Sequence, residues 1–175
     1  MNRLTLALVA ALGTSAAFAM EKPYVGVDYQ LQYLTVNVSD EVQPDAFRLR
    51  LGTDINSYLG VEAQIGVGGS ADSIVVDNQG SIWEARTDSF YALFVKPQLS
   101  IGSAASIFAL AGGSYVDTSA SSSKLGLSKK GFENGFAYGA GVDVNIYKGV
   151  RLGADYIQYL DSFNAVSVGI RIPLN

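Results

Sequence analysis

The sequence predicts an all-β fold, an eight-stranded antiparallel up-and-down transmembrane β-barrel. Three observations predict it. Apolar and polar residues alternate with a period of two in about eight segments of roughly ten residues or more. The connections between these segments alternate between tight turns and long loops. The apolar register of the alternation carries almost no charge, as a face turned toward lipid requires.

The expected strands are separated by turns and loops of regularly alternating length. In chain order we expect the strands at residues 24–36, 46–55, 59–68, 89–101 and 105–116, at two segments within 135–160, and at 163–174. The second, fourth and sixth strands end in tight turns at residues 56–58, 102–104 and 147–149. Long connections follow the first, third and fifth strands, at residues 37–45, 69–88 and 117–133; the connection at Asp161-Ser162 is short. All tight turns therefore lie at one end of the barrel.

Alternation alone does not decide which face looks outward, because a soluble carrier barrel alternates too, with its apolar face inside. Glycines crowd the polar register, and the narrow interior of an eight-stranded barrel needs them: Gly26, Gly52, Gly60, Gly66, Gly139, Gly141, Gly153 and Gly169. Aromatic residues lie near strand ends on the apolar face, as in membrane girdles: Tyr33, Tyr91, Tyr138 and Tyr156. The apolar face is therefore expected to contact lipid. The phase of the fifth strand stays open, because residues 107–111 fit either register.

The first nineteen residues have the three parts of a secretory signal peptide. Arg3 supplies a positive charge, residues 4–12 form an apolar run, and Ala17-Phe18-Ala19 matches an A-x-A cleavage site. The run is shorter than the about 20 residues of a membrane-spanning helix. A buried N-terminal helix is the alternative, but no amphipathic period or helix cap accompanies the run. We expect residues 1–19 to be removed and residues 20–175 to form an exported barrel domain.

Composition excludes several classes of function. Without Arg3 the chain carries 11 Lys and Arg against 16 Asp and Glu, a net charge of −5 without a basic stripe, which excludes a nucleic-acid-binding protein. Cysteine is absent, so the fold has no disulfides. Histidine is absent too, which excludes Ser-His catalysis and metal sites built on His or Cys. We expect no enzyme activity and no cofactor.

The glycine-spaced stretch YGAGVDVNIYKGVRLGADYIQY, residues 138–159, and the closing strand VSVGIRI, residues 166–172, carry a resemblance to a known family. They resemble the outer membrane protein beta-barrel domain family, the small OmpA/OmpX-type barrels of Gram-negative bacteria. The resemblance covers the chain after residue 19 and implies a monomeric, integral protein of the bacterial outer membrane. Its motif is a pattern rather than a fixed string, so it indicates architecture more than function.

The inward register contains five acidic and five basic residues: Asp28, Arg48, Arg50, Asp54, Glu62, Lys96, Asp143, Arg151, Asp155 and Arg171. Because the signs balance, we interpret them as a salt-bridged plug, with the pairs Glu62–Lys96, Asp143–Arg151 and Asp28–Arg171. The alternative is a narrow, gated ion path lined by the same charges. A transport pore would usually show an excess of one sign.

The long connections are the remaining candidates for contact with other molecules. Three lysines, Lys124, Lys129 and Lys130, lie in a serine-rich segment, while residues 74–76 and Ile82-Trp83 form apolar stretches. The simpler interpretation is a set of solvated loops. The alternative is that the lysines contact lipopolysaccharide phosphates and that the stretch with Trp83 extends strands above the membrane as a binding edge. Such phosphate contacts would weaken with salt.

Two functions from different classes follow from these patterns. The first is a structural or surface-interaction role of adhesin or envelope-integrity type, with outer-membrane lipid, lipopolysaccharide and host or envelope surface molecules as partners. The second is a narrow small-solute or ion channel of porin-like type. A soluble periplasmic binding barrel is the third alternative. Membrane localisation and conductance measurements would separate the three.

Overall fold

The computed structural model describes residues 22–37, 40–69, 72–75, 82–122 and 127–174. The ten strands are β1 (Lys22–Asn37), β2 (Asp40–Val42), β3 (Asp45–Asn56), β4 (Leu59–Gly68), β5 (Asp72–Val75), β6 (Ile82–Ile101), β7 (Ala105–Ser122), β8 (Leu127–Tyr147), β9 (Val150–Leu160) and β10 (Phe163–Pro173). Within these residues there is no helix long and apolar enough to cross a membrane.

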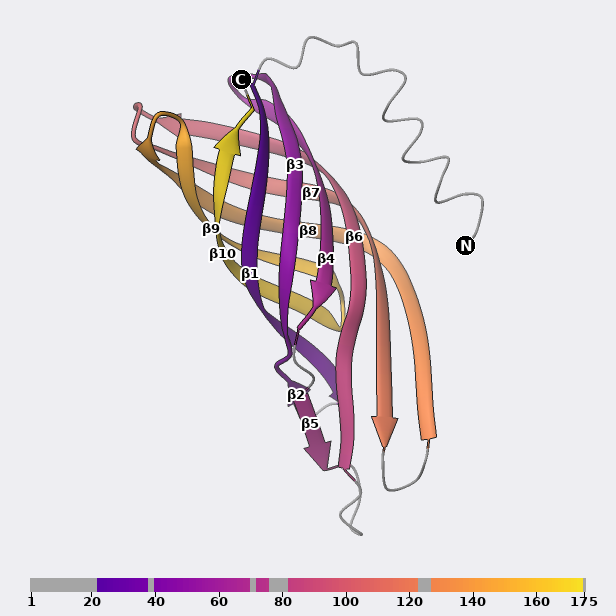
Figure 1. The fold of residues 1–175 in the computed structure, drawn as a ribbon. Helices are drawn as coiled ribbons and strands as arrows, with labels where there is room; N and C mark the ends of the chain where they lie inside the picture. The colour runs from indigo at the N-terminus through magenta and orange to yellow at the C-terminus, as the bar shows by residue number, and fades with distance from the viewer. Residues whose placement is uncertain (1–21, 38–39, 70–71, 76–81, 123–126, 175) are drawn as a thin grey trace.

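Eight of the strands close into one antiparallel barrel in the order β1-β3-β4-β6-β7-β8-β9-β10. The barrel closes because β10 pairs with β1, with Tyr24 opposite Pro173 and Leu34 opposite Phe163. The two short strands lie outside this ring, since β2 pairs with β1 and β5 pairs with β6. Figure 1 shows the tight turns and the C-terminus together at one end of the barrel. The predicted eight-stranded up-and-down barrel is confirmed.

The period of two places apolar side chains on the outer face, and it buries the charged side chains together with a set of aromatic and small residues inside. On β3, Leu49 is 54% exposed, whereas its neighbours Arg48 and Arg50 are buried. The same alternation runs along β10. This arrangement is the reverse of a soluble carrier barrel, and it suits lipid outside and a narrow interior. On β7, whose phase was open, Phe108 and Leu110 point inward.

The tight turns have the backbone conformations that their residues favour. Lys148 has φ 46° and Gly149 has φ 84°, the two positive φ angles of a type I′ hairpin turn. At the β3–β4 turn the backbone N–H of Tyr58 donates to Asn56 Oδ1 at 2.8 Å. These short hairpins fix the register of the strands that they join.

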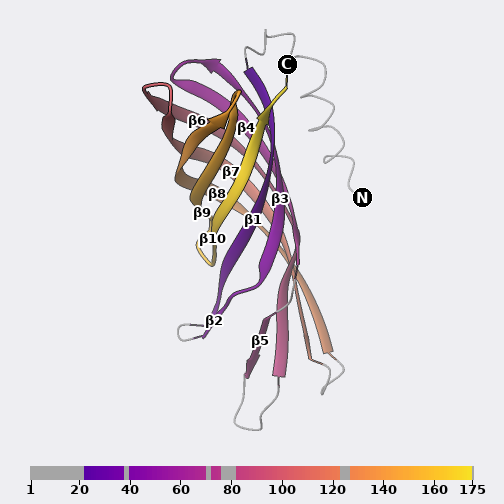
Figure 2. The ribbon, with the colours of Figure 1, turned by 60° about the vertical axis from the view of Figure 1, so that its left-hand side comes forward.

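β6, β7 and β8 are much longer than the sequence predicts, and strands occupy part of all three expected long loops. Within the expected loop 37–45, β2 (Asp40–Val42) is a short strand. β6 begins at Ile82, β7 continues to Ser122 and β8 starts at Leu127, so much of 69–88 and 117–133 is strand. Figures 1 and 2 show these strands reaching beyond the rest of the barrel at the loop end. Residues 130–136 of β8 are exposed on both faces. Polar residues and glycines interrupt the apolar period here, as at Asn134 and Gly135, so the sequence resembles that of a loop.

Candidate functional site

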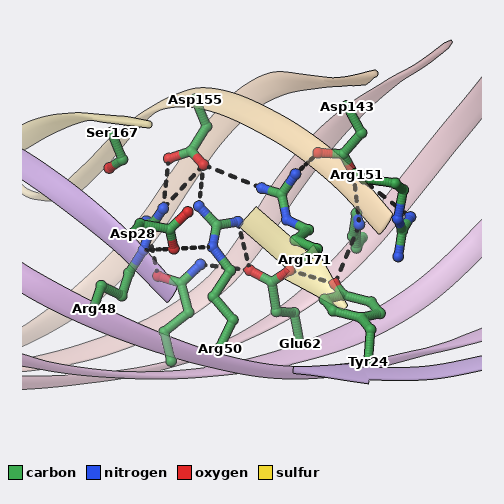
Figure 3. Close-up of polar contacts among 12 residues, drawn as sticks. Tyr24, Asp28, Arg48, Arg50, Glu62, Asp143, Arg151, Asp155, Ser167 and Arg171 are labelled. Atoms are coloured by element: carbon green, nitrogen blue, oxygen red, sulfur yellow. Dashed lines mark hydrogen bonds and ion pairs between the residues drawn. The ribbon is translucent and has the colours of Figure 1, made fainter. Parts of the chain in front are cut away.

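The turn-side half of the lumen holds a network of buried ion pairs (Figure 3). Arg50 on β3 lies at its centre: its Nε donates to Asp28 Oδ2 at 2.6 Å and its Nη1 donates to Glu62 Oε1 at 3.0 Å. Its third contact is with Asp155 on β9, across the lumen. One guanidinium therefore joins carboxylates from β1, β4 and β9.

Two of these three carboxylates, Asp155 and Asp28, each pair with more than one basic side chain, whereas Glu62 pairs with Arg50 alone among the described residues. Asp155 also accepts from Arg48 Nη2 at 3.0 Å and from Arg171 Nη2 at 3.4 Å. Asp28 Oδ2 accepts from Arg48 Nε at 3.0 Å as well as from Arg50. Because the side chains of both arginines are 0% exposed, these bonds replace the water that the charges lost on folding.

A second group of charges surrounds Asp143 on β8, nearer the turns. Asp143 pairs with Arg171 on β10, and its Oδ2 lies 3.7 Å from Lys96 Nζ and 3.6 Å from Arg151 Nη1. Tyr24 connects the two groups, because its hydroxyl donates to Glu62 and accepts from Lys96 Nζ at 3.2 Å. The charges thus form one continuous network from strand to strand around the lumen.

The loop-side half of the lumen is filled by aromatic rings instead. Tyr159 on β9 lies 4.9 Å from the Phe90 ring and 5.2 Å from the Phe163 ring, centroid to centroid. All three side chains are at most 1% exposed. Tyr159 also joins the two halves, because its hydroxyl accepts from Arg48 Nη1 at 2.9 Å and donates to Gln64 Oε1 at 2.8 Å.

The protruding strands carry a second aromatic group on the outer face of the sheet. The Tyr115 and Phe132 rings stack at 6.0 Å, and Tyr91 lies 6.5 Å from Tyr115. Lys130 lies two residues before Phe132 on the same face of β8 and is therefore farther from the barrel. Its side chain is exposed. This places one lysine just beyond an aromatic band.

The chain as a whole matches a family model described as "Outer membrane protein beta-barrel domain" over residues 4–169. This match spans most of the chain and agrees with the closed barrel and its apolar outer face. The chain belongs to the outer membrane protein beta-barrel domain family. It is therefore an integral protein of the bacterial outer membrane.

Solved structures of small outer-membrane barrels share this fold. Ail, the attachment invasion locus protein of Yersinia pestis, solved with the heparin analogue sucrose octasulfate, is 18% identical with a TM-score of 0.60, covering 86% of this chain and 98% of Ail. Neisserial surface protein A is 15% identical with a TM-score of 0.58, covering 86% and 96%. The N-terminal barrel domain of Pseudomonas aeruginosa OprF is 13% identical with a TM-score of 0.58, covering 86% and 97%. No curated protein sequence matches the chain. At these identities the structures show the family fold alone.

The structure places the ten predicted lumen charges unequally. Eight of them are buried in the network: Asp28, Arg48, Arg50, Glu62, Lys96, Asp143, Asp155 and Arg171. Arg151 lies at its margin with a side chain 16% exposed. Asp54 lies at the turn-end mouth of the barrel and forms no ion pair among the described residues.

The expected pairing of these charges is only partly the observed one. Glu62 contacts Arg50 rather than Lys96, and Asp28 contacts Arg48 and Arg50 rather than Arg171. The expected Asp143–Arg151 pair is present at 3.6 Å, shared with Lys96 and Arg171. The long arginine side chains reach diagonally and across the lumen, which strand adjacency does not predict.

The predicted surface residues are described only in part. The backbone of Trp83 pairs with Ile74 in the β5–β6 ladder, so both expected apolar stretches contribute to strands. Lys129 belongs to β8 through its backbone. Lys124, Val76 and the side chains of Trp83 and Lys129 lie outside the described part of the chain, as does the predicted signal peptide of residues 1–19.

Sequence reasoning missed the inward aromatic residues as part of the site. Phe90 and Phe94 lie an even number of residues from Lys96 and therefore point to the same side of β6. The period of two could therefore have predicted that these two rings point into the lumen. Tyr24 and Tyr159 likewise occupy inward positions. No group of three or more His, Cys, Asp or Glu able to hold a metal occurs among the described residues. The described side chains of the lumen form ion pairs, hydrogen bonds and aromatic contacts.

Proposed function

We propose that this chain is a non-conducting, non-enzymatic monomeric barrel with a structural or surface-interaction role in the envelope. The observation that carries the proposal is the burial of the lumen charges, since the side chains of both Arg50 and Glu62 are 0% exposed. A water-filled pore would leave such groups hydrated. The aromatic layer on the loop side of these charges, centred on Tyr159, supports the proposal because it would block the lumen at a second level.

Contact with other molecules then falls to the protruding strands. The outer face of the protruding strands carries an aromatic band, formed by Tyr91, Tyr115 and Phe132, and Lys130 lies farther from the barrel than this band. At a membrane interface, aromatic rings lie at the headgroup level and cations lie just above them, which is the same sequence of side chains along the barrel axis. Lipopolysaccharide phosphates are the anions that a cation meets at this height. We propose these phosphates as the first partner of Lys130, together with Lys124 and Lys129.

The edge of β8 supports contact with a further surface molecule from the host or the envelope. β9 pairs with β8 only from Tyr138 toward the turn, so Leu127–Ala137 has no strand partner on that side among the described residues. An exposed edge of this kind can add an extended peptide as another strand. The neighbouring segment that includes Trp83 pairs with β5 and widens the same sheet.

Planar-bilayer conductance of the refolded protein tests the closed lumen. We expect low and intermittent conductance in the wild type, and a rise in Arg50→Ala, which leaves three carboxylates without that base. Tyr138→Ala, which removes an exposed ring, is the control and should not raise it. A large and steady wild-type conductance would support the narrow small-solute or ion channel instead.

Vesicle binding tests the lipopolysaccharide contact. Lys130→Gln should weaken the association of the refolded protein with lipopolysaccharide aggregates relative to phospholipid alone, and added salt should reduce the difference. Lys130→Arg, which keeps the positive charge at the same position of β8, is the matched control and should bind as the wild type does. Equal effects of the two substitutions would contradict the proposed contact.

We further propose that residues 1–19 are a cleaved signal peptide, a proposal that rests on the sequence. N-terminal sequencing of the protein from outer membranes should begin at Met20. A start at Met1 would contradict it.

A further inference from the structure

We propose that the turn-end mouth of the barrel binds a small organic anion, through a phosphate or carboxylate group, with Arg151, Lys148 and Lys22 as its cationic partners. The mouth is a cavity of about 660 Å³ lined by residues of β1, β3, β6, β7, β8, β9 and β10. Cavities of about 300–1,000 Å³ are typical of small-molecule sites. This proposal concerns the end opposite the protruding strands and is independent of the surface role.

The charge of the cavity wall points to an anion. Three basic side chains line it, Lys22, Lys148 and Arg151, against one acidic residue, Asp54. This excess of positive charge contrasts with the net charge of −4 of the whole chain. No carboxylate pairs with Lys22 or Lys148 among the described residues. A bound anion would supply the counter-charge that the wall lacks.

Arg151 is the best placed of the three cations to bind directly. Its guanidinium carbon lies 4.8 Å from the centroid of the Tyr24 ring, a cation–π contact between two residues that line the cavity. Its one ion pair, to Asp143, is 3.6 Å long, beyond hydrogen-bond distance. The N–H donors of Arg151 form no hydrogen bond among the described residues, so they remain available for a two-point contact with an oxyanion.

The floor of the cavity explains why an anion would stop there. Tyr24 is 1% exposed and its hydroxyl belongs to the network with Glu62 and Lys96. Arg151 lines the cavity, and Figure 3 shows it beside Asp143 and Tyr24 at one edge of the network, so a group that enters from the turn end would meet Arg151 before the buried charges. The short turns of such barrels face the periplasm, so the ligand would come from that side. Asp54 on the wall would accept a hydrogen bond from a donor elsewhere on the ligand.

Nuclear magnetic resonance titration of the full barrel in phosphate-free detergent micelles tests the site. Inorganic phosphate and glycerol phosphate form one arm, N-acetylalanine forms the carboxylate arm, and neutral N-acetylalanine amide is the control ligand. We expect saturable shifts of the Gly102 and Gly149 amides, which line the cavity, with at least one anion. The arm that binds more tightly identifies the anionic group. Equal shifts with the neutral amide, or no saturable shift with either anion, would overturn the proposal.

Substitutions then assign the partners. Arg151→Gln should weaken binding about tenfold, the loss expected for one charge-assisted contact. Lys148→Asn keeps a residue that tolerates the positive φ of the turn and should weaken binding less. Lys130→Gln, at the far end of the barrel, should leave the affinity unchanged. Circular dichroism confirms that each variant is folded, and unchanged affinity in both folded Arg151→Gln and Lys148→Asn would overturn the assignment.

Discussion

The Phe90 ring occupies the space that a side chain on Gly66 would need. The two residues face each other on the paired strands β4 and β6, and a β-carbon on Gly66 would overlap the ring. The glycine on one strand is thus the complement of the aromatic ring on the next. The same relationship joins Gly52 to Tyr24. The crowded interior of a small barrel requires this alternation of small and large groups.

Gly66→Ala should therefore destabilise the barrel. The added methyl group forces the Phe90 ring out of its position, and overpacking of this kind costs about 1–3 kcal/mol. Urea titration of the refolded protein in lipid measures the change. Gly113→Ala is the matched control, because the nearest atom to a β-carbon there is 3.8 Å away. Equal losses in the two variants would contradict the packing described here.

An arginine substitution on the outer face should lower the free energy of unfolding, and the loss should grow with the depth of the site in the membrane. Leu49 is 54% exposed in the middle of β3, and Leu49→Arg should cost about 2–4 kcal/mol if the site lies near the bilayer midplane. Phe132 is 72% exposed on the protruding part of β8, and Phe132→Arg should cost about 0–1 kcal/mol. Unfolding in lipid vesicles gives both values. A reversed order would show that the barrel sits differently in the membrane.

The Arg50–Glu62 pair should be strongly coupled. Glu62→Gln alone leaves Arg50 with one carboxylate fewer, and breaking a buried pair costs about 3–5 kcal/mol. The double variant with Arg50→Met removes both charges, so we expect a coupling energy of about 0.5–3 kcal/mol in a double-mutant cycle. A cycle of Glu62→Gln with Lys130→Met joins residues that make no contact and should be additive. Additivity in the first cycle as well would argue against a structural ion pair.

Loss of the Tyr159 hydroxyl should destabilise the junction between the two lumen layers. Tyr159→Phe keeps the ring stack but leaves Arg48 and Gln64 each without one buried partner, which costs about 1–3 kcal/mol. Tyr138→Phe removes an exposed hydroxyl bonded to Gln158 and should cost much less. Denaturant titration of both variants makes the comparison. A similar small loss in both would mean that water replaces the hydroxyl in the lumen.

The sequence by itself determined which face of the strands meets lipid, with the exception of β7. Leu49 and Arg50 point in opposite directions because consecutive side chains in a strand alternate, whatever the neighbouring strands are. The tight turn at Lys148-Gly149 was also readable, since glycine takes the left-handed conformation easily. These features depend only on residues that are close in the chain, so the amino-acid sequence is enough to predict them.

The tertiary structure alone decided which charges meet and which strands continue beyond the rest of the barrel. Arg50 reaches Asp155 across the lumen, from β3 to β9, and that contact depends on how the closed ring staggers its strands. The phase of β7 needed the same closure, because Phe108 is apolar and fits either face by composition. The protruding ends of β7 and β8 form strands through pairing with each other, from Val116–Glu133 to Ser122–Leu127. Apolar residues are sparse in these segments, so backbone hydrogen bonds between the two strands, rather than an apolar side-chain period, hold that part of the sheet.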